Sequence, residues 1–271
     1  MGRVIRETDW LDTPLGPIEQ WPPALLSSLS ICLNARFPMA IYWERAGYLL
    51  YNDAWRPILG QKHPWALGRA ARDVWPEIWD AIAPLFASVW DTGEGTWRGD
   101  ELLPMQRFGY TEECYFDYTF NPIRGQSGEI EGILNVVLET TYRVLNDRRM
   151  ALLRELAAHS GSAQSEQDAC AMSIAAMATD AADIPFALLY LVDPEEQCAR
   201  LVEATGLAMD SVARTSLIDL QPEAAPQPWP LAETLRDGNP ITVELTERFG
   251  PLQCGVWPEP VTQALIQPIT I

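Results

Sequence analysis

The stretch that decides the fold is Phe37–Gly60, FPMAIYWERAGYLLYNDAWRPILG. An apolar run lies on each side of the turn Glu44–Gly47, and this pattern predicts a β-hairpin. Asn52 follows the second run and can cap the first turn of a new helix. Pro57 fits only the first turns of that helix, and Gly60 ends it. A hairpin that leads into a capped helix, with aromatic walls around an apolar interior, is typical of the start of a small sensory pocket.

Length and charge limit the classes of function. With 271 residues the chain is long enough for two domains of about 100–200 residues each. The net charge is −18, from 37 acidic and 19 basic residues. Because phosphate contacts need Lys and Arg, this balance argues against a nucleic acid or an anionic membrane surface as a partner.

The cysteines and the apolar segments indicate the compartment. The five cysteines are far apart and form no CxxC pair, so we expect buried free thiols rather than a metal site or a disulfide framework. The N-terminal sequence MGRVIRETDW lacks the apolar region of a secretory signal. No window approaches about 18 uninterrupted apolar residues, so we expect a cytoplasmic protein without membrane insertion.

The composition changes along the chain, which predicts two domains of different character. Nine of the eleven Trp lie at or before Trp97, and the chain becomes Ala-rich after about residue 160. We expect four segments: an N-terminal arm and helix over 1–35, a first domain over 36–141, a helical linker over 142–164 and a second domain over 165–271.

The first domain is predicted to be an α+β fold. After the hairpin, apolar residues at three- and four-residue spacing predict a helix through Ile78–Trp90. Three strands follow, over about 95–107, 109–124 and 130–141. In the middle strand Cys114, Phe116, Tyr118 and Phe120 share one face. We therefore expect a five-stranded antiparallel sheet with its helices on one side.

The linker and the second domain are less sharply defined. Taking Leu145 and Leu152 as a positions places Leu156 at a d position, which predicts a parallel dimeric coiled coil, although Arg149 interrupts the seam. The alternative is a single amphipathic helix that packs back on its own domain. The second domain is expected to have a helix over 165–182, strands over 184–192 and 198–204, and an apolar final strand over 264–271. From that last strand we expect the sequence to be a fragment of a longer chain.

The first domain resembles the PAS family. The resemblance covers about residues 28–144 and is carried by Asn52-Asp53-Ala54, Leu67-Gly68-Arg69 and the aromatic strand Tyr115–Ile123. Glu139 and Thr141 fit the acidic-x-Thr signature that joins a PAS core to its signalling helix. The resemblance implies an input domain whose output is passed on through that helix.

Other segments resemble the N-terminal PAS domain of large bacterial hybrid sensor histidine kinases. They include Thr13–Pro17, Arg36–Met39, Lys62–Gly68 and Trp75–Trp79. From Ser165 onward the chain is similar to a GAF domain that lacks its final elements. The resemblance implies a PAS-GAF sensory region of a two-component phosphorelay, a homodimer through the linker helix and a kinase domain further along a longer chain.

We find no catalytic and no metal-ligating set in the sequence. There is no GxSxG, P-loop or HExxH motif, so whether the chain is an enzyme stays open. His159 departs from a phosphoacceptor box, and His63 is expected to be structural. A light-oxygen-voltage flavin site needs a reactive cysteine beside the pocket helices, and none lies between Cys32 and Cys114. We expect no cofactor, but an unidentified small-molecule ligand is compatible with the fold.

Strand parity and helix face give the candidate site residues. The ligand pocket is expected to be lined by Ile41, Trp43, Trp55, Phe86, Trp90, Tyr118, Phe120 and Leu134. The signal relay is expected to run through Glu139, Thr141, Leu145, Leu152 and Leu156. Arg69, Arg72 and Arg107 are candidates to anchor an acidic group.

Two rival functions remain open at this point. The PAS-GAF pair could serve only for dimerisation and protein docking, without a ligand. Alternatively, the sensor could control a phosphatase or a cyclase in place of a kinase. The ligand, the output and the pathway are not encoded in a recognisable motif.

Overall fold

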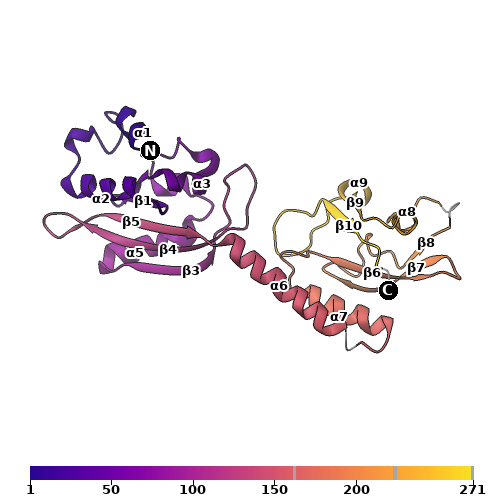
Figure 1. The fold of residues 1–271 in the computed structure, drawn as a ribbon. Coiled ribbons are helices and arrows are strands. Elements are labelled where there is room, and N and C mark those ends of the chain that lie inside the picture. The colour runs from indigo at the N-terminus through magenta and orange to yellow at the C-terminus, as the bar shows by residue number, and fades with distance from the viewer. Residues whose placement is uncertain (161–162, 222–224, 270–271) are drawn as a thin grey trace. The chain divides into compact units, whose positions relative to one another are not determined.

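The computed structural model describes residues 1–160, 163–221 and 225–269 (Figure 1). The chain divides into two compact units, Met1–Leu145 and Asn146–Ile271. The predicted linker is therefore shared between them: helix α6 (Thr141–Ser160) begins in the first unit and continues in the second. Each unit is described by itself.

The first unit is built on a five-stranded antiparallel sheet, as the sequence predicts. Its strands are β1 (Met39–Trp43), β2 (Tyr48–Tyr51), β3 (Thr96–Leu102), β4 (Tyr115–Arg124) and β5 (Ile130–Glu139). Their order across the sheet is β2-β1-β5-β4-β3, so the last strand in sequence lies in the centre beside the first. The register pairs Ile41 with Leu134 and Phe120 with Asn135.

The hairpin and the helix cap are confirmed. The turn after β1 closes with a hydrogen bond of 3.0 Å from the Gly47 N–H to the Glu44 carbonyl, and both residues have positive φ, 68° and 58°. Asn52 Oδ1 accepts from the Trp55 N–H at 3.1 Å and so caps the 3-10 turn Asp53–Trp55. That turn leads directly into α3 (Arg56–Leu59), which Gly60 ends with a φ of 54°.

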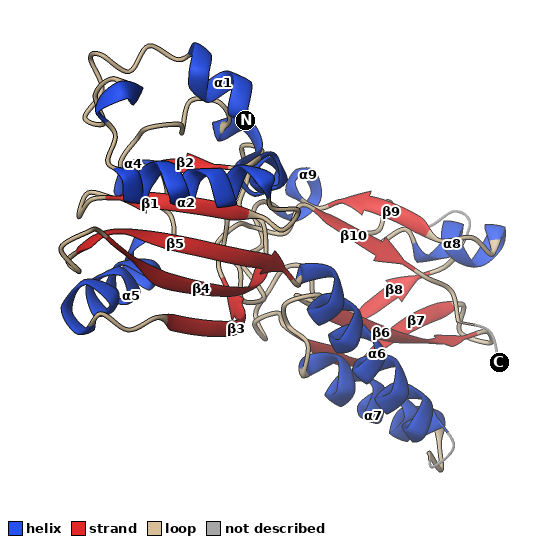
Figure 2. Ribbon diagram, turned by 60° about the vertical axis from the view of Figure 1, so that its left-hand side comes forward, coloured by secondary structure: helices blue, strands red, loops and turns tan. Residues whose placement is uncertain are grey.

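Helices cover both faces of this sheet, which corrects the expectation that they lie on one side. On one face are α3, α4 (Ala71–Val74) and α5 (Trp79–Thr92). The helix α2 (Pro23–Asn34) lies across the other face, as Figure 2 shows. Its apolar residues Leu25, Leu29 and Cys32 are buried in the same core as the strands. The helix itself was predicted, but its amphipathic pattern does not say which face of the sheet it covers.

The N-terminal arm is part of this core. It contains α1 (Gly2–Glu7), which the sequence analysis did not predict, and two buried indoles, Trp10 and Trp21, whose ring centroids are 5.1 Å apart. Trp10 Nε1 donates to the Ile5 carbonyl at 2.7 Å, and Trp21 Nε1 donates to the Gly16 carbonyl at 2.9 Å. The arm is thus fixed by its own aromatic packing and hydrogen bonds.

The second unit is an α+β arrangement with two small sheets. The first sheet joins β6 (Ala187–Asp193), β7 (Cys198–Thr205) and β8 (Leu217–Asp219) in that order. The second pairs β9 (Ile241–Glu244) with β10 (Gln263–Ile266) antiparallel. The helices are the later part of α6, α7 (Glu166–Ala178), α8 (Leu231–Asp237) and α9 (Thr246–Phe249). The final strand is shorter than predicted, and residues 270–271 lie outside the described residues.

Ion pairs join α6 to the turn after α7. Asp183 accepts from Arg148 Nη2 at 2.8 Å and from Arg149 Nε at 2.9 Å. Arg148 also pairs with the buried Asp180, with 3.2 Å between Nε and Oδ1. Arg149, which interrupts the predicted coiled-coil seam, therefore has an intramolecular partner.

Candidate ligand cavity and its link to the exit helix

A small cavity of about 40 Å³ lies between the sheet of the first unit and helices α3 to α5. Its wall is formed by Tyr42 of β1, by Phe116, Tyr118 and Phe120 of β4, by Asn135 and Val137 of β5, by Trp55, Ile58, Trp75, Ile78 and Ile82 of the helical side, and by Leu103 and Met105 of the segment after β3. None of these side chains is charged. The cavity therefore suits an apolar or uncharged guest.

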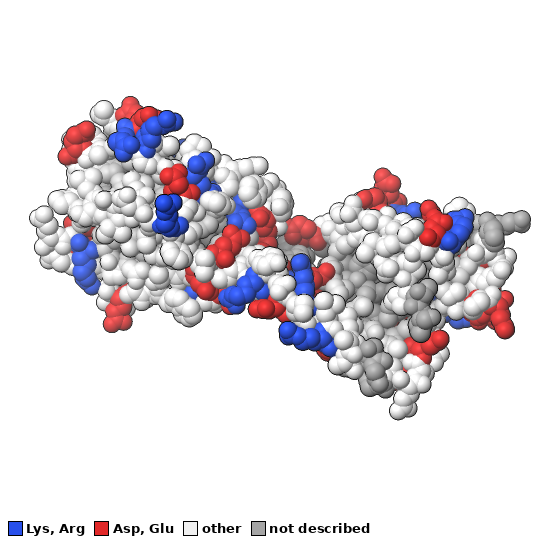
Figure 3. Space-filling model, viewed as in Figure 1, with Lys and Arg blue, Asp and Glu red and all other residues white. Residues whose placement is uncertain are grey.

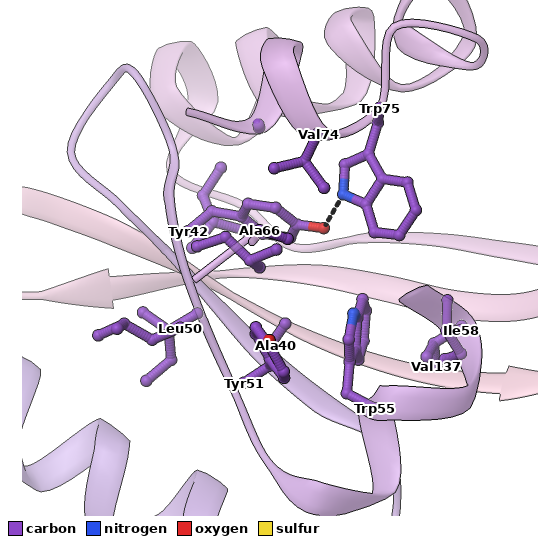
Figure 4. Packing of buried hydrophobic residues seen from close by; sticks show 14 of the residues in the cluster. Ala40, Tyr42, Leu50, Tyr51, Trp55, Ile58, Ala66, Val74, Trp75 and Val137 are labelled. Carbon is purple, nitrogen blue, oxygen red and sulfur yellow. Dashed lines mark hydrogen bonds between the residues drawn. The ribbon is translucent and has the colours of Figure 1, made fainter. Parts of the chain in front are cut away.

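Aromatic contacts hold the wall in place. Tyr42 Oη accepts from Trp75 Nε1 at 3.0 Å, and Figure 4 shows this bond between the strand and the loop before α5. Behind the wall, Phe86 lies 4.9 Å from the Tyr42 ring and 4.7 Å from the Phe120 ring. Such edge and tilted arrangements are favourable for aromatic pairs, so these contacts stabilise the wall on this side.

The two phenols in the wall remain neutral. Burial raises the pKa of Tyr42 well above its usual value, although the hydrogen bond from Trp75 acts in the opposite direction. Burial also raises the pKa of Tyr118, and its hydrogen bond to Glu101, 2.6 Å from Oη to Oε2, adds to the shift. Neither hydroxyl can act as a base near neutral pH. They serve as hydrogen-bonding groups.

Trp55 differs from the other wall residues in one respect. It is only 2% exposed, yet its Nε1 has no hydrogen-bond partner within the described residues. By contrast, the amide of Asn135 is anchored, since Nδ2 donates to the Thr119 carbonyl at 2.9 Å. The wall thus contains an indole N–H that finds no acceptor among the described residues.

The candidate pocket residues are distributed over both faces of the sheet. Trp55, Tyr118 and Phe120 line the cavity. Phe86 packs behind it, and Trp90 of α5 lies outside the wall. Ile41, Trp43 and Leu134 alternate with Tyr42 and Asn135 along their strands, so they face the α2 side of the sheet. Tyr42, Phe116 and Val137 line the cavity without having been proposed.

A polar cluster connects the cavity wall with the start of α6. Arg107 donates to Glu139, from Nη1 to Oε2 at 2.9 Å and from Nη2 to Oε1 at 3.2 Å, and its Nη2 also lies 2.9 Å from Glu112 Oε2. Thr141 Oγ1 donates to Glu139 Oε1 at 3.1 Å and accepts from the Tyr115 N–H at 2.9 Å. Glu139 and Thr141, proposed from their spacing, are therefore brought together. Arg107 is held in ion pairs and does not line the cavity.

A second polar contact holds the first turn of α6. Asp100 sits at a register shift of β3 with a φ of 48°, and its Oδ1 accepts from Thr140 Oγ1 at 2.7 Å. Arg143 of α6 donates to the same oxygen, and this hydrogen bond lowers the pKa of the exposed Asp100 carboxyl. Sequence reasoning missed this cap, because a carboxylate 40 residues before its partner leaves no local pattern.

The three leucines proposed for the relay lie on one side of α6. Leu152 is 9% exposed, and Leu145 and Leu156 are partly buried. The large exposed apolar side chains of α6 are Tyr142, Met150 and Leu153. Leu152 is thus covered within its own chain.

A wider surface concavity of about 520 Å³ lies over α4 and the start of α5. It is lined by Trp65, Arg69, Arg72, Asp73, Pro76, Trp79 and Asp80. The Arg69 guanidinium lies over the Trp65 ring, 4.4 Å from its centroid. The proposed acid anchors Arg69 and Arg72 therefore share one surface, which also carries two carboxylates.

The remaining candidates have structural surroundings. His63 Nδ1 lies 2.8 Å from the Tyr51 hydroxyl. The side chain of His159 lies outside the described residues. Among the residues that are described, no group of His, Cys, Asp and Glu is arranged to hold a metal ion. No helix in that part of the chain combines the length and apolarity needed to cross a membrane.

Comparison with protein families decides the identity of the first unit. Residues 39–145 match the family model described as the PAS fold. They form a PAS domain. The match ends at Leu145, the residue at which the first compact unit also ends. No curated protein matches the chain.

Solved structures similar to this chain include other PAS domains. A sensory box sensor histidine kinase from Vibrio cholerae is 19% identical with a TM-score of 0.33, over 43% of this chain and 90% of that one. The PAS domain of BvgS from Bordetella pertussis is 19% identical with a TM-score of 0.37, over 48% and 96%. The PAS domain of histidine kinase ThkA is 21% identical with a TM-score of 0.29, over 37% and 98%. Because these TM-scores and identities are low, the PAS domain is identified by the match to the family model alone.

Proposed function

We propose that the PAS domain is a sensory input domain, in which a small molecule in the cavity changes how Arg107 holds the start of α6. One observation carries this proposal. The short segment 103–107 both lines the cavity and forms hydrogen bonds with the last residue of β5, the strand that leads into α6. Leu103 and Met105 are wall residues, and Arg107, two positions further, binds Glu139 through both carboxylate oxygens.

The physical link is short. Alternation along an extended segment places Leu103 and Met105 on the cavity side. A guest that displaces Met105 also moves the backbone at Arg107. Because bidentate geometry tolerates little displacement, such a movement weakens the contact with Glu139 and, through it, the contact with Thr141. A ligand that binds one arrangement more tightly shifts the population toward it.

The wider role follows from the sequence resemblance. We infer that α6 passes the signal, as part of a cytoplasmic homodimer, to a histidine kinase core in a bacterial two-component phosphorelay. The support is the acidic-x-Thr exit at Glu139 and Thr141 and the segments similar to hybrid sensor kinases. The order of α7, β6 and β7 supports a GAF-like assignment of residues 165–271. The surface is consistent with a partner other than nucleic acid, since acidic and basic side chains are interleaved over the face drawn in Figure 3.

The test combines identification of a bound molecule with a readout at α6. The purified chain is examined by native mass spectrometry, and any bound molecule is released and identified. Hydrogen exchange of the first turn of α6 is then compared between wild type, Val137→Leu, which fills the cavity, and Val136→Leu, a matched change on the opposite face of β5. Faster exchange in Val137→Leu alone supports the proposal. Equal exchange in all three proteins contradicts it.

The rival function, docking and dimerisation without a ligand, is favoured by the small volume of the cavity. About 40 Å³ is far below the roughly 150 Å³ of an apolar cavity that takes benzene. A protein that carries no small molecule after purification, and whose α6 exchange responds to dimerisation only, would support this rival.

A further inference from the structure

Buried indole nitrogens in this protein normally have an acceptor. Trp10, Trp21, Trp75 and Trp229 each donate from Nε1, to the Ile5 carbonyl, the Gly16 carbonyl, the Tyr42 hydroxyl and the Ala213 carbonyl respectively. Trp55 and Trp90 are the exceptions among the buried indole nitrogens of the described residues. Trp55 lines the cavity and Trp90 does not. A buried N–H without an acceptor costs free energy, so the exception at the cavity needs a reason.

Local structure holds Trp55 where it is. Its backbone N–H is capped by Asn52 Oδ1 at 3.1 Å, and its side chain lies in the wall together with Ile58 of the next helix. Figure 4 shows Tyr42, Trp55 and Trp75 approaching the same space from three different elements. The Tyr42 hydroxyl accepts from Trp75, and its own hydrogen is left to be donated. Two donors of the wall, from Trp55 and Tyr42, are thus available to a guest.

We propose that the cavity takes a compact, uncharged organic molecule that presents a hydrogen-bond acceptor, a carbonyl oxygen or an equivalent atom, to Trp55 Nε1. This inference rests on the proposed sensory function and names the chemical class of its ligand. The acceptor completes the hydrogen bond that the protein leaves unmade, and the rest of the molecule contacts the aromatic wall.

The wall excludes a charged ligand. All thirteen side chains around the cavity are uncharged, so an ion would lose its hydration without gaining a counter-charge. The cations beside the wall already have partners: Arg107 is engaged by Glu112 and Glu139, and Lys62, which lies over the Trp75 ring, is engaged by Glu77. A carboxylic acid or an amine is therefore a poor guest.

The volume limits the size of the ligand. About 40 Å³ holds only a few heavy atoms, and a small ring enters if a wall residue yields. Met105 is the wall residue best suited to yield, because its unbranched thioether chain adopts many conformations. Its displacement is also the movement that the proposed signal requires.

The experiment compares two probes of equal shape, cyclopentanone and methylenecyclopentane, which differ in having or lacking the acceptor oxygen. Binding to the full chain is followed by the ¹⁵N–¹H signals of the indoles, which are assigned on the wild type by triple-resonance and NOE spectra. Cyclopentanone is expected to bind more tightly and to shift the Trp55 signal most. Trp55→Phe is expected to weaken cyclopentanone about 5- to 10-fold, as for one lost hydrogen bond, and to leave methylenecyclopentane unchanged. Trp90→Phe is the matched control, because it removes an indole N–H outside the wall that also has no acceptor among the described residues, and it is expected to change neither affinity.

The outcomes separate this inference from the proposed function. If both probes bind equally and the Trp55 signal does not respond to the carbonyl, the acceptor assignment is overturned while the cavity remains a binding site. A water that satisfied Trp55 would give this result. If neither probe perturbs any cavity residue, the sensory function fails as well. Because the indole shifts are measured on the wild type, the test stands even if Trp55→Phe does not fold.

Discussion

Both terminal nitrogens of Arg107 contact the two carboxylate oxygens of Glu139, at 2.9 and 3.2 Å, across 32 residues of sequence. The Arg107 side chain is 10% exposed and that of Glu139 is 32% exposed. This pair joins the segment beside the cavity to the last residue of β5, which directly precedes α6.

We expect Arg107→Gln to destabilise the PAS domain by about 2 kcal/mol, since Glu112 and Glu139 lose their hydrogen bonds to a charged donor that is itself only 10% exposed. The first turn of α6 should exchange its amide hydrogens faster. Urea unfolding and hydrogen exchange check both effects. Arg98→Gln is the control and should cost less than about 0.5 kcal/mol, because the exposed Arg98 approaches Glu101 at 3.7 Å and donates to the carbonyl of its neighbour Trp97 at 3.0 Å. Equal losses in the two variants would remove the special role of Arg107.

Asn52 is predicted to be the most sensitive polar residue of the first unit. Its Nδ2 donates to three backbone carbonyl oxygens, those of Cys32, Ala35 and Phe37, and its Oδ1 accepts from Met39 and Trp55. Asn52→Ala leaves these buried groups unpaired and should cost about 3 kcal/mol. Asn34→Ala, on the exposed end of α2, should change stability by less than about 0.5 kcal/mol. Thermal or urea unfolding measures both, and a small effect of Asn52→Ala would mean that water replaces the amide.

The second unit should lose stability at acid pH through Asp183. Burial alone would raise the pKa of this carboxyl, but hydrogen bonds from Arg149 and Arg148 outweigh it and hold the pKa below its usual value. A lowered pKa means that the unfolded state takes up the proton first. The stabilisation is therefore complete above about pH 5 and is lost as the pH falls through about 4 and below.

The test of this prediction is the pH dependence of urea unfolding between pH 7 and pH 3. Asp183→Asn should be less stable than wild type at pH 7, and the difference should shrink toward pH 3. Asp210→Asn, an exposed carboxylate of the same unit, is the control and should follow the wild type. A constant difference across the range would show that Asp183 does not act through its charge.

The exposed residues of α6 should matter for dimerisation, and the buried one for folding. If α6 pairs with a second copy, Leu153→Asp should abolish the dimer with little effect on unfolding, because Leu153 is 58% exposed. Leu152→Ala should instead destabilise the second unit by about 2–4 kcal/mol. Sedimentation and urea unfolding of both variants distinguish these effects. A dimer lost only in Leu152→Ala would restore the seam predicted from heptad spacing.

The cysteines should react with thiol reagents in a fixed order. Burial raises the pKa of Cys32 to about 12 and that of Cys114 to about 11, so at pH 8 neither is ionised to a useful extent. Cys170 and Cys254 are partly exposed and should react first with Ellman's reagent. Unfolding in guanidinium should make all five thiols reactive. Early labelling of Cys114, identified by peptide mapping, would show that the segment around Arg107 opens in the native state.

The sequence predicts the sheet better than it predicts the cavity. Alternation placed Phe116, Tyr118 and Phe120 on one buried face, because the other face of β4 is only partly covered. In β1 the residues from Ala40 to Trp43 are all buried, since α2 covers one face and the cavity helices the other. A strand covered on both sides carries no alternation, so its parity could not be read from the sequence.

Some polar contacts at the start of α6 could be predicted from the sequence and others could not. The pair Glu139 and Thr141 is two residues apart and was recognisable as a local signature. Arg107 and Asp100 act across 32 and 40 residues, and only the folded sheet brings them to the start of α6. The unpartnered nitrogen of Trp55 has no sequence signal at all, because it is defined by what surrounds the ring.

The register shift in β3 at which Asp100 lies has a consequence for assembly. β3 is an edge strand, and a regular edge offers a template on which another chain can add a strand. The shift between Arg98 and Glu101 breaks that template and places charges along it. At the opposite edge, β2 is closed by its own chain, with hydrogen bonds of 2.9 Å from the Leu49 N–H to the Arg69 carbonyl and 2.8 Å from the Gly68 N–H to the Leu49 carbonyl. Neither edge of the sheet therefore offers a regular strand on which a second copy could add a strand by cross-β pairing.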